Sequence, residues 1–151
     1  MVSDAHDESK AALREIRDLI RGIHPAILQD RGIDAALSAV VARTRVPVTI
    51  DVALPERPPA PVESTAYFVV SEALANVERH SGATRAHVSI ARTSDRLVVE
   101  VRDDGHGGAD PARGTGLAGL NDRVAAMRGT MYVISPDGGP TTISVELPCA
   151  S

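Results

Sequence analysis

The sequence is poor in aromatic residues, with one Phe, two Tyr and no Trp among its 151 residues. It therefore lacks the stacked rings that bind single-stranded bases, and its core must be built from Ala, Val, Leu and Ile. Its one cysteine, Cys149, cannot form an intrachain disulfide, which fits a reducing cytoplasm. No apolar run approaches the about 18 residues of a membrane span, and the polar start is unlike a signal peptide. We expect a cytoplasmic chain, either free or the cytoplasmic portion of a membrane-bound protein.

A strong charge imbalance is also missing, because 16 Lys and Arg against 20 Asp and Glu give a net charge of −4. This mild acidity gives no general electrostatic surface for nucleic acid or anionic membranes. Hydrophobic residues at 43% and charged residues at 24% are ordinary globular usage, so wholesale disorder is not expected. The length fits one domain with a short appendage.

The N-terminal part, residues 1–45, reads as that helical appendage. Apolar residues at intervals of three and four predict an amphipathic helix over residues 3–23. The pair His24-Pro25 should interrupt it, because proline cannot continue the helical hydrogen-bond ladder. We expect a second short helix after this break, with Asp34 as its N-cap.

Residues 46–151 read as a layered domain. The expected elements are a strand over 46–54, a proline-rich loop over 54–61, a long helix over 62–80, a hairpin of strands over 85–91 and 96–102, a helix over 117–127 and a closing hairpin over 131–135 and 142–147. The predicted fold class is α/β (α+β), a two-layer sandwich in which helices cover a mixed, mainly antiparallel sheet.

The long helix carries the first group of candidate residues, Glu72, Asn76, Arg79 and His80. Their spacings of four, three and one place them on a common polar side of the helix. A carboxylate, an amide, a cation and an imidazole could together bind a metal-phosphate group, with the amide oxygen on Mg²⁺. A solvated helix face with no ligand explains the same spacing.

Two glycine-rich segments follow. Asp103, Gly105 and Gly107 stand at the end of a strand, where glycine allows a tight turn and an acid could accept a hydrogen bond from an amine such as that of adenine. An acidic hairpin turn is the other interpretation. Residues 114–119 lead into a helix, whose free amides attract phosphate, although the P-loop lysine is missing.

In their order and spacing, these segments resemble the nucleotide-binding domain of sensor histidine kinases, members of the wider GHKL ATPase superfamily that includes gyrase B, MutL and the heat-shock chaperone ATPases. Residues 71–80 look like the N box, residues 101–107 like the G1 box and residues 114–124 like the G2 box. Residues 138–141 resemble the terminal Gly-Gly-Gly-Thr signature, with Pro140 in place of a glycine. The match covers about residues 62–148 and implies the GHKL (Bergerat) fold.

The resemblance implies roles for the helix residues. Glu72 would orient or deprotonate the histidine that accepts the phosphoryl group. Asn76 would ligate Mg²⁺, and Arg79 and His80 would contact the phosphates of ATP. Transfer would run mostly by positioning and charge neutralisation.

The resemblance also implies an adenine pocket in which Asp103 binds the amine and Gly105 and Gly107 shape the walls. The loop over residues 109–116 would act as an ATP lid. The remaining nucleotide-binding residues implied by the motifs are Gly114, Gly116, Leu117 and Thr141.

The upstream segment, residues 13–37, is similar to the second dimerisation helix and connector of the kinase subfamily that partners response regulators with helix-turn-helix outputs. The acceptor-histidine motif of that subfamily is missing, and His6 lacks its basic lead-in. The resemblance thus implies that this chain is a fragment of a homodimeric kinase. The fragment alone could not autophosphorylate, and the full-length kinase would have a response regulator as its partner. The alternative is an anti-sigma factor, a serine kinase that sequesters its partner with the same nucleotide fold.

Overall fold

The computed structural model of the protein describes residues 26–109 and 116–149. Two short helices, α2 (Ala26–Arg31) and α3 (Ile33–Arg43), precede strand β1 (Val48–Ala53). The long helix α4 (Ala60–Asn76) continues into a π-helical turn, η1 (Val77–Ser81). The remaining elements are β2 (Ala86–Thr93), β3 (Arg96–Asp103), α5 (Gly116–Ala126), β4 (Thr130–Ile134) and β5 (Thr141–Pro148).

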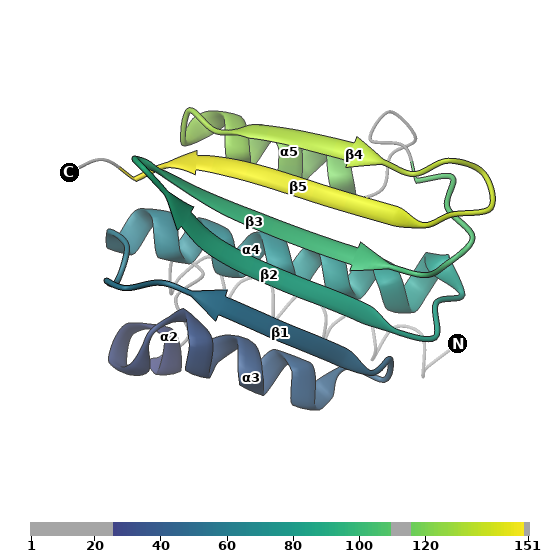
Figure 1. Ribbon diagram of the computed structural model, residues 1–151, viewed down its shortest axis with the longest axis horizontal. Helices are drawn as coiled ribbons and strands as arrows, with labels where there is room; N and C mark the ends of the chain where they lie inside the picture. The colour runs from purple at the N-terminus through teal and green to yellow at the C-terminus, as the bar shows by residue number, and fades with distance from the viewer. Residues whose placement is uncertain (1–25, 110–115, 150–151) are drawn as a thin grey trace, which may run out of the picture.

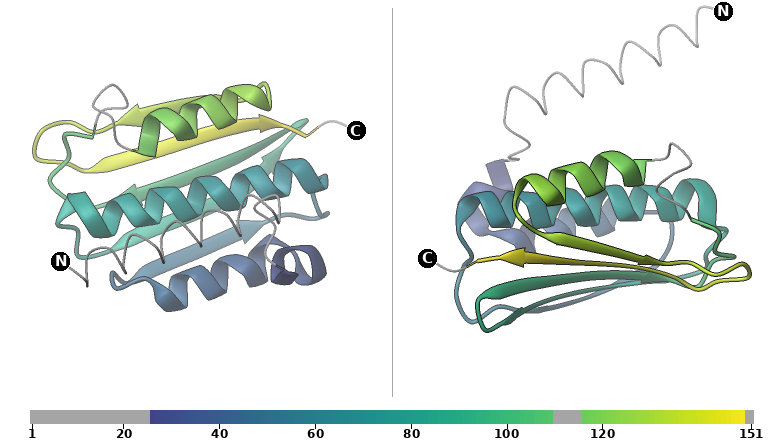
Figure 2. Two further views of the ribbon diagram at one scale, coloured as in Figure 1. Left: turned by 180° about the vertical axis from the view of Figure 1, so that it is seen from behind. Right: turned by 90° about the horizontal axis from the view of Figure 1, so that it is seen from above.

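The strands form one five-stranded sheet in the order β1-β2-β3-β5-β4 (Figure 1). Only β1 and β2 pair in parallel, and the other three pairs are antiparallel. The helices lie together on one face of the sheet, which gives two layers (Figure 2). The predicted two-layer fold with a mixed, mainly antiparallel sheet is confirmed.

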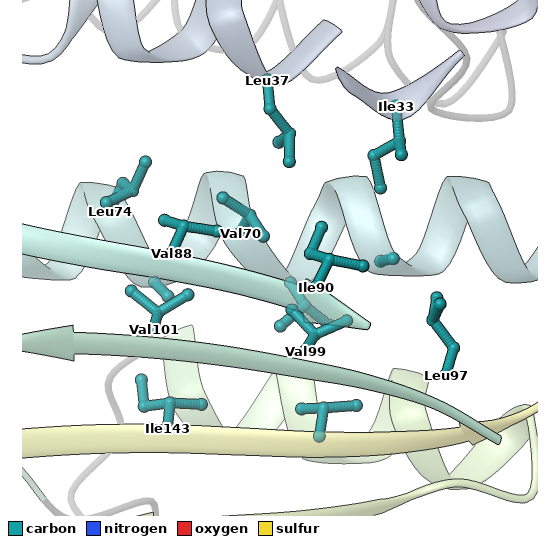
Figure 3. Close-up of a cluster of buried hydrophobic side chains, with 14 of the residues drawn as sticks. Ile33, Leu37, Val70, Leu74, Val88, Ile90, Leu97, Val99, Val101 and Ile143 are labelled. Atoms are coloured by element: carbon teal, nitrogen blue, oxygen red, sulfur yellow. The ribbon is translucent and has the colours of Figure 1, made fainter. Parts of the chain in front are cut away.

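The core fills the space between the sheet and the helices (Figure 3). Along β3, Leu97, Val99 and Val101 are buried while the residues between them are not, which is the period-two pattern of a half-buried strand. Small and branched aliphatic residues dominate the core, as the scarcity of aromatic residues implied. The large side chains that are fully enclosed are Leu28, Leu37, Leu74, Ile90, Leu97, Leu117, Leu120, Leu147, Val69, Val70, Val88 and Val99.

Two helix starts differ from expectation. The N-cap of α3 is Gly32, at φ 89°, and Asp34 lies in the first turn, so the prediction of Asp34 as N-cap is wrong. The helix therefore begins two residues earlier than an N-cap at Asp34 implied, and its first residue, Ile33, is packed in the core at 3% exposed. Helix α4 begins at Ala60, two residues early, because Pro61 is well suited to the first turn of a helix.

The predicted helix over residues 3–23 and the break at His24-Pro25 lie outside the described residues. The division of the chain at residue 45 stays a prediction.

Candidate functional site

The candidate site lies at the end of the sheet where β3 finishes and β5 begins. Asp103, the last residue of β3, pairs in register with Thr141, the first residue of β5. Asp103 is 5% exposed, and its Oδ1 accepts a hydrogen bond of 2.8 Å from the amide of Gly105. Burial raises the pKa of Asp103, and the charge of Asp104 adds to this effect. Within the described residues Oδ2 accepts no hydrogen bond, so it could accept one from a ligand.

The neighbouring carboxylate, Asp104, has a different environment. Its Oδ1 accepts hydrogen bonds from the amides of Thr84 (2.7 Å) and Arg85 (3.0 Å), and its Oδ2 accepts one from the Thr84 hydroxyl. The Thr84 hydroxyl and these amides lower the pKa of Asp104. Asp104 therefore ties the start of β2 to the end of β3, while Asp103 faces inward.

Two glycine loops interlock beside Asp103. Gly107 (φ 74°) and Gly139 (φ 77°) both adopt backbone that favours glycine. A Cβ on Gly107 would overlap the carbonyl oxygen of Pro136, and one on Gly139 would overlap that of Gly105. The amide of Gly138 donates to the carbonyl of His106 at 2.7 Å. Residues 105–108 and 135–139 thus form one unit that a side chain at either contact would separate.

Thr141 is linked to this pair of loops through the hydroxyl of Ser135. Its hydroxyl lies 2.6 Å from the Ser135 hydroxyl, which accepts a hydrogen bond of 2.9 Å from the amide of Ala109. Ser135 was not predicted from the sequence, because it stands six residues before Thr141 outside any motif. A serine at the end of a strand beside a glycine loop is a weak signal that could have indicated it.

Helix α4 presents the other half of the site. The Asn76 Oδ1 accepts only a long hydrogen bond of 3.4 Å from Arg79, and its Nδ2 is buried without a partner among the described residues. Arg79 also donates from Nε to the carbonyl of Ala75 at 3.3 Å. Glu72, one turn before Asn76, is half-buried. A buried amide with so few hydrogen bonds has capacity left for a ligand.

The two halves meet where α4 ends. The helix passes through its π-helical turn and stops at Gly82, which is left-handed at φ 64°. A Cβ on Gly82 would lie 3.2 Å from Cδ2 of His106, so the end of the helix is beside the loop that follows β3. A π-helical turn in a helix is frequent at functional sites.

Helix α5 closes the site from the other side. A Cβ on Gly116, its first residue, would lie 3.0 Å from Oε2 of Glu72. The side chain of Leu117 is 2% exposed and belongs to the core. Gly114, the rest of the predicted lid over residues 110–115 and the side chain of His80 lie outside what the structure describes.

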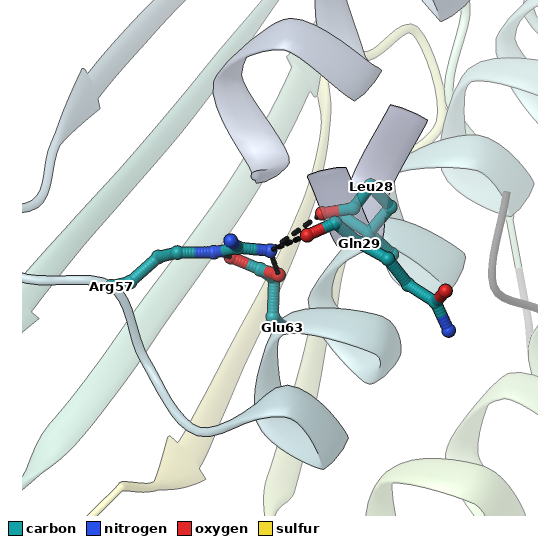
Figure 4. Close-up of polar contacts among 4 residues, drawn as sticks. All are labelled: Leu28, Gln29, Arg57 and Glu63. Carbon is teal, nitrogen blue, oxygen red and sulfur yellow. Dashed lines mark hydrogen bonds and ion pairs between the residues drawn. The ribbon is translucent and has the colours of Figure 1, made fainter. Parts of the chain in front are cut away.

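A cleft of about 450 Å³ lies at the opposite end of α4 and is lined by Gln29, Arg57, Pro58, Ala60 and Glu63. In it Arg57 donates to Glu63 from Nε at 3.0 Å and from Nη2 at 2.8 Å. The same Nη2 donates to the carbonyls of Leu28 and Gln29 (Figure 4). Because Arg57 and Glu63 are paired with each other and Arg57 also donates to backbone carbonyls, we interpret this cleft as a structural junction and not as a ligand site.

No group of His, Cys, Asp and Glu residues in the described ranges could hold a metal ion by itself. Nor is any helix there long and apolar enough to cross a membrane. A metal ion at Asn76 would need ligand phosphates to complete its shell.

Comparison with known proteins places the chain in a family. Residues 62–151 match the family described as histidine kinase-, DNA gyrase B- and HSP90-like ATPase. The sensor histidine kinase MctS of Rhizobium johnstonii is 32% identical over 91% of this chain and 32% of its own length. The sensor histidine kinase NarS of Mycobacterium tuberculosis is 33% identical over 92% of this chain and 35% of its own length. The chain thus spans about a third of the length of these curated relatives.

Solved structures share the fold. The histidine kinase AdeS of Acinetobacter baumannii superposes with a TM-score of 0.68 at 16% identity, over 99% of this chain and 84% of that one. The histidine kinase domain of a blue-light activated kinase from Erythrobacter litoralis gives a TM-score of 0.63 at 22% identity, over 77% of this chain and 58% of that one. The chain belongs to the histidine kinase-, DNA gyrase B- and HSP90-like ATPase family, which makes it an ATP-binding domain.

Proposed function

We propose that this ATPase-family chain is the catalytic domain of a two-component sensor histidine kinase and donates the γ-phosphate of ATP to a histidine on a separate dimerisation helix. The observation that carries the proposal is the buried Asp103, with one carboxylate oxygen open, at the same end of the sheet as Asn76. Relatives named sensor histidine kinases support it.

Asp103 is the adenine contact. A buried carboxylate oxygen accepts a hydrogen bond from the exocyclic amine of adenine, and a site built around that hydrogen bond rejects bases that lack the donor. Gly105 and Gly107 shape the pocket wall, because the 105–108 loop packs so closely on the 136–139 loop that a Cβ on Gly107 or Gly139 would overlap the facing loop, and Thr141 holds these loops through Ser135. Gly114 and Leu117 are the remaining nucleotide-binding residues of the proposal.

The phosphates of ATP lie between α4 and the start of α5. The amides around Gly116 open an 11-residue helix, and such amides attract anions. Asn76 is the protein ligand of Mg²⁺, and its scarce hydrogen bonds fit that role. When bound, Mg²⁺ supplies charge neutralisation at the phosphates. Arg79 adds positive charge at the end of this helix, and His80 is the second proposed phosphate contact.

Glu72 is the catalytic residue. One nitrogen of a neutral imidazole attacks the γ-phosphorus, and the bond to the β,γ-bridging oxygen breaks to release ADP. The proton on the other imidazole nitrogen then passes to the Glu72 carboxylate, which lies one turn from Asn76. The half-buried position of Glu72 leaves the carboxylate accessible to a helix arriving from outside this domain.

The parent protein, on this proposal, is a homodimeric kinase that passes its phosphoryl group to a response regulator with a helix-turn-helix output. Residues 1–45 belong to its dimerisation and connector region, and residues 46–151 form the ATP-binding domain. The domain works in the cytoplasm, whether or not the parent is bound to a membrane.

The test begins with the chain alone. Calorimetric titration with Mg·ATP should show binding, and incubation with γ-labelled Mg·ATP should leave no acid-labile phosphate on the chain. Adding a fragment that carries the parent's acceptor helix should produce phosphohistidine on that fragment. Phosphate on His24 of the isolated chain would contradict the proposal, and phosphate on a serine of a partner protein would favour an anti-sigma kinase.

A pair of variants assigns the step. Glu72→Ala should slow phosphohistidine formation at least about a hundredfold while ATP affinity changes less than about threefold. Glu56→Ala removes an exposed carboxylate from the proline-rich loop and should leave both unchanged. Equal rates for the two variants would remove Glu72 from the reaction.

A further inference from the structure

Arg123 on α5 is held in an unusual way for a cation. Its Cζ lies 4.1 Å from the ring centroid of Phe68 on α4, so the guanidinium is stacked on the only phenylalanine of the chain. Its side chain is half-buried, and among the described residues it makes no hydrogen bond or ion pair. Burial lowers the pKa of Arg123, and the charge of Glu72 opposes that effect. Burying part of a guanidinium whose donors are unpaired costs folding free energy, so we expect Arg123 to have a functional role.

The position of Arg123 relates it to Glu72. Phe68 and Glu72 are four residues apart on α4 and share one face of that helix. Helix α5 contacts this face twice, through Arg123 at Phe68 and through Gly116 at Glu72. The stack on Phe68 therefore keeps a positive charge one helical turn from the proposed catalytic carboxylate, on its side away from Asn76.

We infer that Arg123 is a positioning residue for phosphoryl transfer: stacked on Phe68, it orients the Glu72 carboxylate toward the incoming imidazole. This inference rests on the proposed function. A direct ion pair would occupy a carboxylate oxygen that must receive the proton, whereas a charge held against the ring attracts the carboxylate and leaves its oxygens free. The half-buried site strengthens the attraction relative to bulk water, and the planar guanidinium is the cation suited to stacking.

Two other roles for Arg123 make different predictions. If it only pins α5 to α4, its removal lowers stability and impairs ATP binding together with transfer. If it binds a phosphate of ATP, its removal weakens ATP affinity first. A positioning residue that acts through Glu72 changes the rate of transfer at saturating ATP and loses its effect once Glu72 is gone.

The test uses the chain with the acceptor-helix fragment, in which the wild type must first form phosphohistidine; failure there would contradict the proposed function and not this inference. Arg123→Met keeps the length and the contact with Phe68 but removes the charge. We expect the saturating rate to fall at least about tenfold, with KM for ATP and Tm close to those of the wild type. Arg123→Lys should recover part of the rate, and Arg128→Met, which removes an exposed arginine after the same helix, should change nothing.

The decisive comparison is made in the Glu72→Ala background. There Arg123→Met should slow the residual transfer less than about twofold, because its effect passes through the missing carboxylate. Three results would overturn the inference: an unchanged rate for Arg123→Met, a loss of ATP affinity that accounts for the slower transfer, or a full tenfold loss that persists without Glu72.

Discussion

In the part of the chain that the structure describes, two carboxylates are buried, at opposite ends of the molecule, and they differ in their hydrogen-bond partners. Glu63, in the first turn of α4, is 3% exposed and receives two hydrogen bonds from Arg57. Asp103, at the end of β3, is 5% exposed and receives one hydrogen bond, from the amide of Gly105, with no cation in contact with it among the described residues. The two carboxylates are therefore similarly buried, but only Glu63 is paired with a cation.

The difference separates a structural charge from a binding charge. Arg57 links the end of α2 to the start of α4, and Glu63 raises the pKa of Arg57 through their hydrogen bond. Asp103 instead has a raised pKa because burial disfavours its ionised form, and the Gly105 amide and the charge of His106 oppose this effect only in part. A buried acid with that deficit is better suited to receive a ligand than to hold the fold together.

The largest effect is expected where the loops beside Asp103 interlock. In Gly107→Ala the new Cβ would overlap the Pro136 carbonyl at a residue with φ 74°. We expect the free energy of unfolding to fall by about 1–3 kcal/mol and ATP affinity to fall more than about a hundredfold, as seen by thermal unfolding and calorimetry. Gly138→Ala is the matched control, because Gly138 has φ 89° but open space around its Cβ position. Equal losses of ATP affinity in both variants would assign the effect to backbone strain and not to the overlap.

The next effect isolates Asp103 itself. Asp103→Asn should weaken ATP binding about ten- to a hundredfold, because the amide is a poorer acceptor for the adenine amine. Its stability should be equal to or higher than that of the wild type, because a buried charge is removed while the Asn oxygen can still accept from Gly105. Asp104→Asn should instead lower Tm and leave ATP affinity nearly unchanged, because Asp104 accepts three structural hydrogen bonds from Thr84 and Arg85. Unchanged ATP affinity in a folded Asp103→Asn chain would remove this residue from the site.

At the other end of the molecule, removing the partner of the buried Glu63 should affect stability and not ATP affinity. Arg57→Met leaves Glu63 buried without its cation, so Tm should fall while ATP affinity stays within about twofold of the wild type. Adding Glu63→Gln should recover part of the lost Tm, because it removes the unpaired charge. Arg43→Met, an exposed arginine at the end of α3, serves as the control. A large loss of ATP affinity in Arg57→Met would mean that the two ends of α4 are not independent.

The smallest effect is a difference in pH dependence. Because the pKa of Asp103 is raised in the folded chain, the folded state binds more protons than the unfolded state just above the usual aspartate range. The contribution of Asp103 to stability is therefore lost as pH rises through that window up to the raised pKa. Denaturant unfolding at a series of pH values should show Asp103→Asn gaining on the wild type across the window and matching it below. Parallel profiles would contradict the raised pKa.

Much of the fold could be predicted from local sequence. Alternating apolar residues specified the β2–β3 hairpin, and the terminal hairpin and α5 also lie where their patterns indicated. These predictions succeed because side-chain period and turn chemistry act over a few residues. The candidate residues of the site were proposed from motifs whose glycines and polar residues stand at fixed offsets, and their roles stay predictions.

What the sequence determined by itself was therefore the set of elements and the residue types available for chemistry. Tertiary structure alone decided the parallel pairing of β1 with β2, the contact of Gly107 with the 136–139 loop and the stack of Arg123 on Phe68. It also decided that Glu63 is paired and Asp103 is not. Each of these depends on groups distant in the chain, whose proximity follows from packing the helices on the sheet. Since Glu63 and Asp103 are similarly buried, the presence or absence of a paired cation determines which charge is left for a ligand.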